Sequence, residues 1–317
     1  MTEFDFHPQK PDLIETESKT SWPATIFSIV LFILVFMFMF SNEINFILAL
    51  VLVLLIHELG HFIMMKIFGY KNVRMLFIPL MGAFVHGKKD EYSLKESLLV
   101  VGAGPFPGVI VGFLMMLFSQ QLHSTHMFQG GLLFFILNII NLAPLDPLDG
   151  GQLVKLIFSK NHEKFLMIFS FVSSILIIAI GFFLNSILLM LFGFFMGFRV
   201  RALQKNYYLH QDMKEDEIPF ITSYKELSNK DFWRIKHIIL ERTPTLKKYI
   251  EISEDEEEVN LLLASQVNSV LITPVKDDAS FFLKFSTITL WTFSLISPFI
   301  LYFLLDLNWV QYAVQSW

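Results

Sequence analysis

The sequence contains no cysteine and few charged residues, and both shortages restrict what the protein can be. Without cysteine the chain has no disulfide and no thiolate metal site, so any zinc must be bound by histidine and carboxylate side chains. Charged residues make up 17% of the 317 residues and hydrophobic residues 54%, with 36 phenylalanines. This balance excludes a single soluble core and indicates an integral membrane protein. The net charge of -5 gives no reason to expect a nucleic-acid partner.

Residues 1–21 lack the apolar core that a cleaved signal peptide needs, so we expect a polar N-terminal tail. Apolar runs begin after this tail, and their lengths match the thickness of a bilayer. The sequence predicts an all-α polytopic membrane protein with about six or seven transmembrane helices. The runs of spanning length lie at about 24–41, 44–67, 97–119, 165–184 and 280–305, and shorter ones at about 130–145 and 186–198.

Lysine and arginine are missing from every second connection between these runs. The stretches 41–45 and 120–129, Asn185 and the residues after Asp306 contain neither, whereas the other connections contain many. Because positively charged loops stay in the cytoplasm, the basic connections are predicted to be cytoplasmic and the others to face outward. We therefore expect a multi-pass protein of the cell membrane, with its N-terminus and residues 199–279 in the cytoplasm.

This topology divides the chain into four parts. Within the cytoplasmic domain, Ser228 precedes a helical pattern as an N-cap would, and the acids from Glu254 to Glu258 fit the start of another helix. We find no chemical motif there, so the role of the domain stays open. The parts are a cytoplasmic tail at 1–21, a membrane core at 22–198, the cytoplasmic domain at 199–279, and a last transmembrane helix with a short outer tail at 280–317.

The apolar stretch from Val73 to Val85 is interrupted by Pro79 and Gly82, so it is not expected to span the membrane. We predict a short membrane-associated β-loop near 73–86. Non-helical backbone is tolerated at membrane depth only when it is buried in protein or lines a wet cavity. An interfacial loop that merely connects two helices is the alternative.

Inside the second apolar run the sequence reads His57-Glu58-Leu59-Gly60-His61. Residues four apart lie on one face of a helix, so both histidines can bind one metal ion with Glu58 beside it. This is the H-E-x-x-H arrangement of zinc hydrolases, in which Glu58 would be the general base. An ionisable residue at bilayer depth costs about 2.5 to 3.5 kcal/mol on insertion scales, so a functional role is expected. Three paired or snorkelling polar residues without a metal are the alternative.

A catalytic zinc site needs a third protein ligand. Residues 141–151 supply a candidate, because two prolines end a helix there and the carboxylate of Asp149 then precedes two glycines. The predicted topology places this segment toward the cytoplasmic side, like the two histidines. For Asp149 taken alone, an ordinary Asp-Gly turn is the alternative.

With both segments considered together, the chain resembles the site-2 protease family of intramembrane zinc proteases. The signatures of that family are H-E-x-x-H and N-x-x-P-x-x-P-L-D-G, and both occur in this sequence. The resemblance implies one zinc ion per chain, bound by His57, His61 and Asp149. It also implies Glu58 as general base and Asn141 as an amide that contacts substrate or stabilises the transition state.

The likeness covers roughly residues 44–160 and includes 81–85, which looks like the family's membrane-inserted β-loop. It implies hydrolysis of a peptide bond in or near a transmembrane segment of a membrane-protein substrate, within the lipid bilayer. A regulatory membrane partner or a homo-oligomer is left open, and no nucleic acid is expected. Two other classes are a non-catalytic membrane scaffold with structural zinc or none, and an ion transporter. The presence of Glu58 argues against the scaffold, and the lack of Asp, Glu and His in the remaining spans argues against the transporter.

The chain departs from the family pattern at two places. Where the family often has G-P-x-x-N, this chain reads Gly104-Pro105-Phe106-Pro107-Gly108, so that asparagine is missing. Asp146 stands where many relatives have a proline or an apolar residue. It is an alternative ligand, a partner for the N–H of a ligating histidine, or a solvated loop acid, and the last interpretation is favoured.

Overall fold

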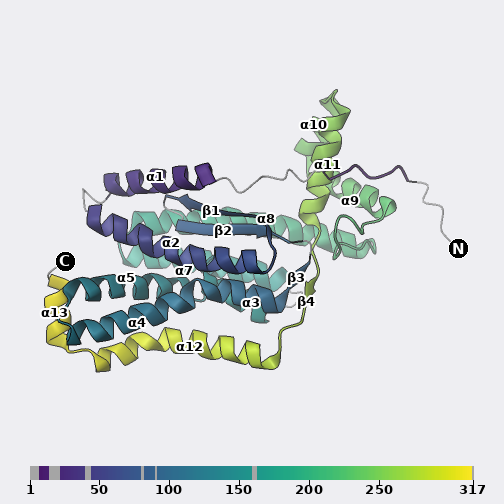
Figure 1. Cartoon of the computed structure of the whole chain (residues 1–317). Helices are drawn as coiled ribbons and strands as arrows, with labels where there is room; N and C mark the ends of the chain where they lie inside the picture. Colours follow the sequence, from purple (N-terminus) through teal and green to yellow (C-terminus); the bar gives the residue numbers. More distant parts are fainter. Residues whose placement is uncertain are drawn as a thin grey trace. The chain divides into compact units, whose positions relative to one another are not determined.

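The chain divides into two compact units (Figure 1). The larger unit comprises Ser18–Lys89, Ser93–Met196 and Asp277–Trp317, and the smaller comprises Met1–Glu17, Asp90–Tyr92 and Gly197–Lys276. Most of the predicted tail 1–21, and Leu80 and Met81 of the predicted β-loop, lie outside the described residues. The computed structural model describes residues 7–13, 22–39, 44–79, 82–89, 91–158 and 163–315.

Apolar helices make up most of the larger unit. Five segments of the described chain are long and apolar enough to cross a membrane: α2, the contiguous pair α3 and α4, α7, α8 and α12. A shorter apolar helix, α1, precedes them, and α5 holds most of the predicted run 130–145. The predicted all-α polytopic membrane fold is therefore confirmed. The helices are α1 (Trp22–Met39), α2 (Ile44–Ile67), α3 (Leu94–Ala103), α4 (Pro105–Gln121), α5 (Thr125–Asn141), α6 (Asp149–Phe158), α7 (Glu163–Phe183), α8 (Ile187–Glu215), α12 (Phe281–Leu304) and α13 (Leu307–Gln315).

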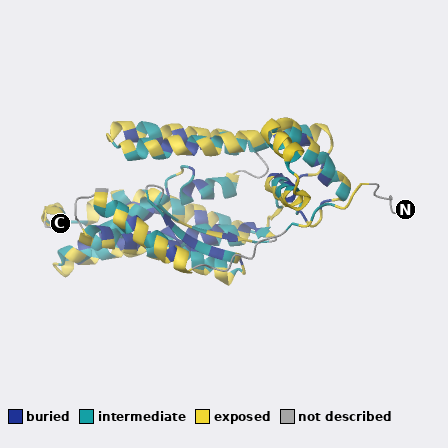
Figure 2. Ribbon diagram, turned by 90° about the horizontal axis from the view of Figure 1, so that it is seen from above, coloured by how far each residue is buried: buried dark blue, intermediate teal, exposed yellow. Residues whose placement is uncertain are grey.

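Many large apolar side chains on these helices are exposed rather than buried. Exposed positions, yellow in Figure 2, recur along the helices, and Phe38, Phe183 and Phe303 are each more than four-fifths exposed. A soluble protein rarely exposes so much contiguous apolar surface, whereas a lipid bilayer covers it at no cost. The distribution of burial therefore agrees with a helix bundle embedded in lipid.

The predicted β-loop is an antiparallel hairpin. Strand β1 (Lys71–Ile78) pairs with β2 (Gly82–Lys88), with Met75 opposite Val85 and Phe77 opposite Ala83. The hairpin lies between α1 and α2, which contact it from both sides (Figure 1). The predicted β-strand pairing of this segment is confirmed, and its depth in the membrane stays a prediction.

Helix α1 covers the outer edge of β1 through two hydroxyl groups. The Thr25 hydroxyl donates to the Met75 carbonyl at 2.7 Å, and the Phe77 N–H donates to the Ser28 hydroxyl at 3.1 Å. Residues opposite each other in an antiparallel pair direct their backbone groups either toward each other or both outward. Met75 and Phe77 direct theirs toward α1, so their partners Val85 and Ala83 direct theirs away from β1. The outer edge of β2 is therefore the side of the hairpin that faces away from α1.

The smaller unit is helical and has its own apolar core. Its helices are α9 (Asn229–Arg242), α10 (Pro244–Ile252) and α11 (Glu256–Val270), joined by residues 197–215 of α8. The short strands β3 (Tyr92–Ser93) and β4 (Val275–Lys276) lie where the chain passes between the two units. Phe232 and Ile235 are fully buried at the centre of this core. The predicted helix starts are confirmed, since Ser228 caps α9 and Asp255 caps α11.

Candidate metal centre

Two histidines of α2 lie one turn apart on a buried face of the helix. His57 and His61 are 5% and 7% exposed, and Glu58 between them is 5% exposed. Side chains of this kind are rarely buried at such depth without a partner. Their burial therefore indicates that each has a partner inside the protein.

Asp149 reaches the two histidines from a different part of the chain. Pro144 and Pro147 follow the end of α5 and prevent that helix from continuing, and α6 begins at Asp149. The indole N–H of Trp291 in α12 donates to the Leu142 carbonyl at 2.7 Å and holds the end of α5. This sharp break in the chain presents the Asp149 carboxylate to α2.

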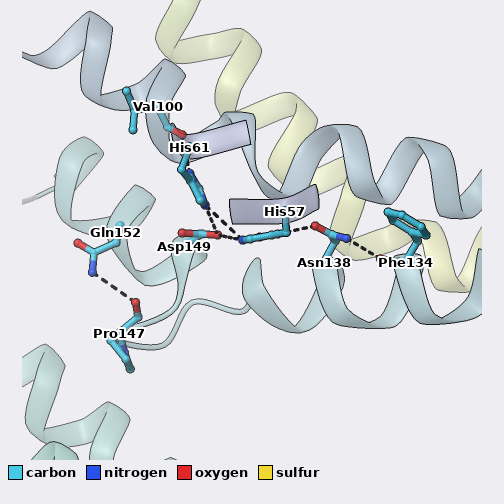
Figure 3. Close-up of polar contacts among 8 residues, drawn as sticks. All are labelled: His57, His61, Val100, Phe134, Asn138, Pro147, Asp149 and Gln152. Carbon is cyan, nitrogen blue, oxygen red and sulfur yellow. Dashed lines mark hydrogen bonds and ion pairs between the residues drawn. The ribbon is translucent and has the colours of Figure 1, made fainter. Parts of the chain in front are cut away.

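Three potential ligand atoms converge at one point (Figure 3). Asp149 Oδ2 lies 3.0 Å from His57 Nε2 and 3.3 Å from His61 Nε2, and the two Nε2 atoms are 3.2 Å apart. Among the described residues, these three form the group of side chains able to hold a metal ion. The residues predicted as ligands are thus brought together.

The other nitrogen of each imidazole fixes which tautomer is present. His61 Nδ1 lies 2.8 Å from the Val100 carbonyl, which can only accept a hydrogen bond. His57 Nδ1 lies 2.7 Å from Oδ1 of Asn138, whose own Nδ2 donates to the Phe134 carbonyl at 2.7 Å (Figure 3). Both Nδ1 atoms therefore carry the proton, and both Nε2 atoms present lone pairs.

These lone pairs face a carboxylate oxygen that also has only lone pairs. Asp149 Oδ2 is buried, and no described residue donates a hydrogen bond to it. Three acceptors within 3.3 Å of one another repel each other unless a cation lies between them. Tetrahedral zinc with ligand distances of about 2.0 to 2.1 Å separates its ligands by about 3.3 Å, so the geometry fits this ion. With three protein ligands, a fourth position is left for water or substrate.

Glu58 lies beside this cluster and is not one of the three converging ligands. The backbone N–H of Val85, on the outer edge of β2, faces its carboxylate. Glu58 is therefore held between the metal position and the outer edge of β2. A proton acceptor placed there lies next to both the water position and any segment that pairs with β2.

Asn138 is a site residue that the sequence analysis missed. A Cβ atom on Gly108 would lie 2.2 Å from Nδ2 of Asn138, so the amide occupies the space next to this glycine. Gly108 stands where the family pattern G-P-x-x-N has its asparagine, and the amide that lies beside it belongs to Asn138 of α5. An asparagine within the apolar part of α5 was the available signal, because an amide is costly to bury there without a partner.

Asn141, the predicted catalytic amide, lies half-buried at the last residue of α5. None of the hydrogen bonds within the described residues joins it to His57, His61 or Asp149. Its role toward substrate stays a prediction.

For Asp146 the favoured interpretation as a solvated loop acid is wrong. The residue is 2% exposed, pairs with Lys155 of α6, and accepts a hydrogen bond from the Ser170 hydroxyl at 2.6 Å. The Asp146 N–H also donates to the Ser173 hydroxyl at 3.1 Å. Asp146 thus connects the segment before Asp149 to α6 and α7.

Part of the chain is similar to known proteins. Residues 45–130 match the model of peptidase family M50, a range that includes His57, Glu58 and His61 but ends before Asp149. The chain is 36% identical over 118 residues to stage IV sporulation protein FB of Bacillus subtilis, and 34% identical over 123 residues to zinc metalloprotease MJ0392 of Methanocaldococcus jannaschii. These alignments cover 36% and 37% of this chain, and 40% and 35% of the two relatives.

Proposed function

We propose that this protein, whose residues 45–130 match the model of peptidase family M50, is a zinc-dependent endopeptidase that cleaves membrane proteins in or near a transmembrane segment. The observation that carries the proposal is the convergence of His57 Nε2, His61 Nε2 and Asp149 Oδ2 within 3.3 Å of one another. The buried carboxylate of Glu58 beside them supplies the base that hydrolysis requires.

The residues of the site divide the chemistry among them. When bound to His57, His61 and Asp149, one zinc ion supplies the Lewis acid that polarises water and the scissile carbonyl. Glu58 accepts a proton from the attacking water and delivers it to the leaving amine. Asn141, at the end of α5, is the candidate amide for the developing oxyanion.

A transmembrane substrate has to unwind before it can be cleaved, because a helix keeps its carbonyl groups in internal hydrogen bonds. The outer edge of β2 carries the N–H and C=O of Ala83 and the C=O of Val85, which such a segment could pair with, while the Val85 N–H faces Glu58. Strand addition there would replace the hydrogen bonds that the substrate loses on unwinding. It would also bring the peptide next to Glu58.

Proline substitution on β2 tests the strand-addition step. Ala83→Pro removes an N–H from the outer edge of β2. The two neighbouring positions are unsuitable: Phe84→Pro would remove an N–H that faces β1, and proline at position 82 cannot adopt the φ of 92° that Gly82 has. We expect Ala83→Pro to reduce cleavage at least about tenfold with zinc content unchanged, and Ala83→Val to remain near wild type. Equal activity of the two variants, or equal loss of zinc and activity in Ala83→Pro, would refute strand addition.

The main test separates metal binding from catalysis. The purified protein is assayed for zinc and for cleavage of single-span membrane proteins, alongside Glu58→Gln and Asp149→Asn. We expect Glu58→Gln to keep its zinc and lose cleavage, and Asp149→Asn to lose both. Undiminished cleavage by Glu58→Gln would contradict the base assignment. A wild-type protein that binds zinc but cleaves nothing in the panel would favour the scaffold, and ion flux without cleavage would favour the transporter.

We also propose that the N-terminus and residues 199–279 face the cytoplasm of the cell membrane. The absence of arginine and lysine from the predicted outer connections supports this orientation. Because the chain has no cysteine, single-cysteine variants can be labelled without background. In intact cells an impermeant maleimide should label Gln121→Cys and spare Lys247→Cys, both of which replace exposed residues. The reverse pattern would invert the topology.

A further inference from the structure

The N-terminal segment at residues 7–13 lies on the smaller unit and is held there mainly through Lys10. The Lys10 ammonium donates to the backbone carbonyls of Tyr224, Lys225 and Leu227 at 2.6, 3.2 and 2.5 Å. It also lies 5.1 Å from the centre of the Tyr224 ring, within the range of a cation–π contact. Three acceptors and an aromatic face match an ammonium group, which has three donors and no acceptor.

The backbone of the segment is held by side chains of the same unit. Asn229 Oδ1 accepts from the Lys10 N–H at 3.0 Å, the Trp233 indole N–H donates to the Pro8 carbonyl at 2.7 Å, and the Tyr224 hydroxyl donates to the Pro11 carbonyl at 2.7 Å. Hydrogen bonds to main-chain atoms fix an extended peptide without reading its sequence. Selectivity therefore depends on the side chain of Lys10.

Little of the segment is buried. His7, Pro8, Gln9 and Asp12 are exposed, while Leu13 packs against the core of the smaller unit. The core does not need residues 7–12 to be complete, because its fully buried members come from elsewhere in the unit. The segment is thus bound in the manner of a peptide ligand: a lysine in a polar cage, an apolar anchor three residues later, and main-chain contacts between.

We propose that the smaller unit carries a binding site for an extended, lysine-containing peptide, and that residues 7–13 are its tethered occupant. The site consists of the carbonyl groups at 224–227 together with the side chains of Tyr224, Asn229 and Trp233. Peptides with lysine followed by an apolar residue three positions later compete with residues 7–13 for it. This proposal does not depend on the peptidase function.

Peptide binding to the full chain tests the site. The probe is a fluorescent, end-blocked peptide with the sequence of residues 7–13. The protein is either wild type or Lys10→Met, which keeps an unbranched side chain but loses the ammonium group. A tethered segment acts at an effective concentration of the order of 1 mM, so we expect wild type to bind the probe at least about tenfold more weakly than Lys10→Met. Acetylation of the lysine in the probe should weaken its binding to Lys10→Met at least about tenfold.

Two further variants locate the bound peptide. In the Lys10→Met background, Trp233→Phe removes the indole donor and should reduce probe affinity several-fold, whereas Tyr249→Phe removes a hydroxyl elsewhere in the unit and should change nothing. Equal affinity of wild type and Lys10→Met, or of the plain and acetylated probes, would overturn the proposal.

Hydrogen exchange on the wild type gives an independent measurement, since the Lys10 amide should be protected and should lose that protection in Trp233→Phe. An unprotected Lys10 amide in the wild type would also overturn it.

Discussion

The amide of Asn138 on α5 occupies the space beside Gly108 on α4, where a Cβ atom would lie 2.2 Å from its Nδ2. From that position Oδ1 of Asn138 meets Nδ1 of His57 at 2.7 Å. Glycine at 108 and asparagine at 138 therefore form one functional unit: the first makes the room that the second uses. Partners of this kind orient a ligating histidine and fix its tautomer.

Asn138→Ala should weaken zinc binding without removing a ligand. Loss of the group that orients His57 is expected to lower zinc affinity about 10- to 100-fold, as measured by competition with a chelator. Asn141→Ala, one turn further along α5, serves as the matched control and should leave zinc affinity near that of the wild type. If both variants bound zinc like the wild type, Asn138 would have no positioning role.

Gly108→Ala should have a similar effect although residue 108 touches no metal ligand. The new methyl group takes the space of the Asn138 amide and displaces it from His57. Because both changes break the same contact, adding Gly108→Ala to Asn138→Ala should cost little further zinc affinity. Gly197→Ala, whose Cβ would meet nothing within 4 Å, is the control. Additive losses in the double variant would mean that the two positions act separately.

Lys155→Met should destabilise the fold by about 3 to 5 kcal/mol, because it leaves the buried Asp146 carboxylate without its counter-charge. Thermal unfolding in detergent measures the effect, and Lys164→Met on the exposed side of α7 provides the comparison. The double variant Lys155→Met with Asp146→Asn should recover part of the loss, because no buried charge is then left unpaired. A Lys155→Met protein as stable as Lys164→Met would contradict the role of this ion pair.

Asp278 should make stability depend on pH below about 4. The Lys95 N–H and the Ser93 hydroxyl donate to its carboxylate and hold the pKa of Asp278 below its usual 3.8. A lowered folded-state pKa contributes stability that is present above the unfolded value and is lost as the pH falls through the folded one. Asp278→Asn should therefore be less stable than wild type at neutral pH, with the difference shrinking in acid. An acid response identical in both proteins would show that this carboxylate contributes nothing.

The sequence was sufficient for the parts of the protein that depend on local pattern. Apolar runs identified the membrane helices, and the four-residue spacing of His57 and His61 placed both on one helix face. Asp149 was found because a second motif names it. Asn138 could not be identified in this way. Its side chain fits beside Gly108 because glycine has no Cβ, and the spacing of residues within α5 does not reveal a contact with a neighbouring helix.

Two further differences have the same physical origin. Asp146 was expected in solvent because acids in loops usually are, but Lys155 and Ser170 approach it from other elements and satisfy it in the interior. The apolar run 186–198 ends where charged residues begin, yet α8 continues to Glu215. A helix can leave an apolar environment without a break, so hydropathy marks the end of the run and not the end of the helix.

The two hydroxyl groups of α1 on the edge of β1 also bear on enzyme kinetics. With Thr25 and Ser28 bonded to that edge, the hairpin has a single side available for strand addition. Under the proposed function each chain can then hold one extended substrate at a time, and two different substrates should act as purely competitive inhibitors of one another. A mixed or uncompetitive pattern would require a second docking position, which this edge arrangement does not provide.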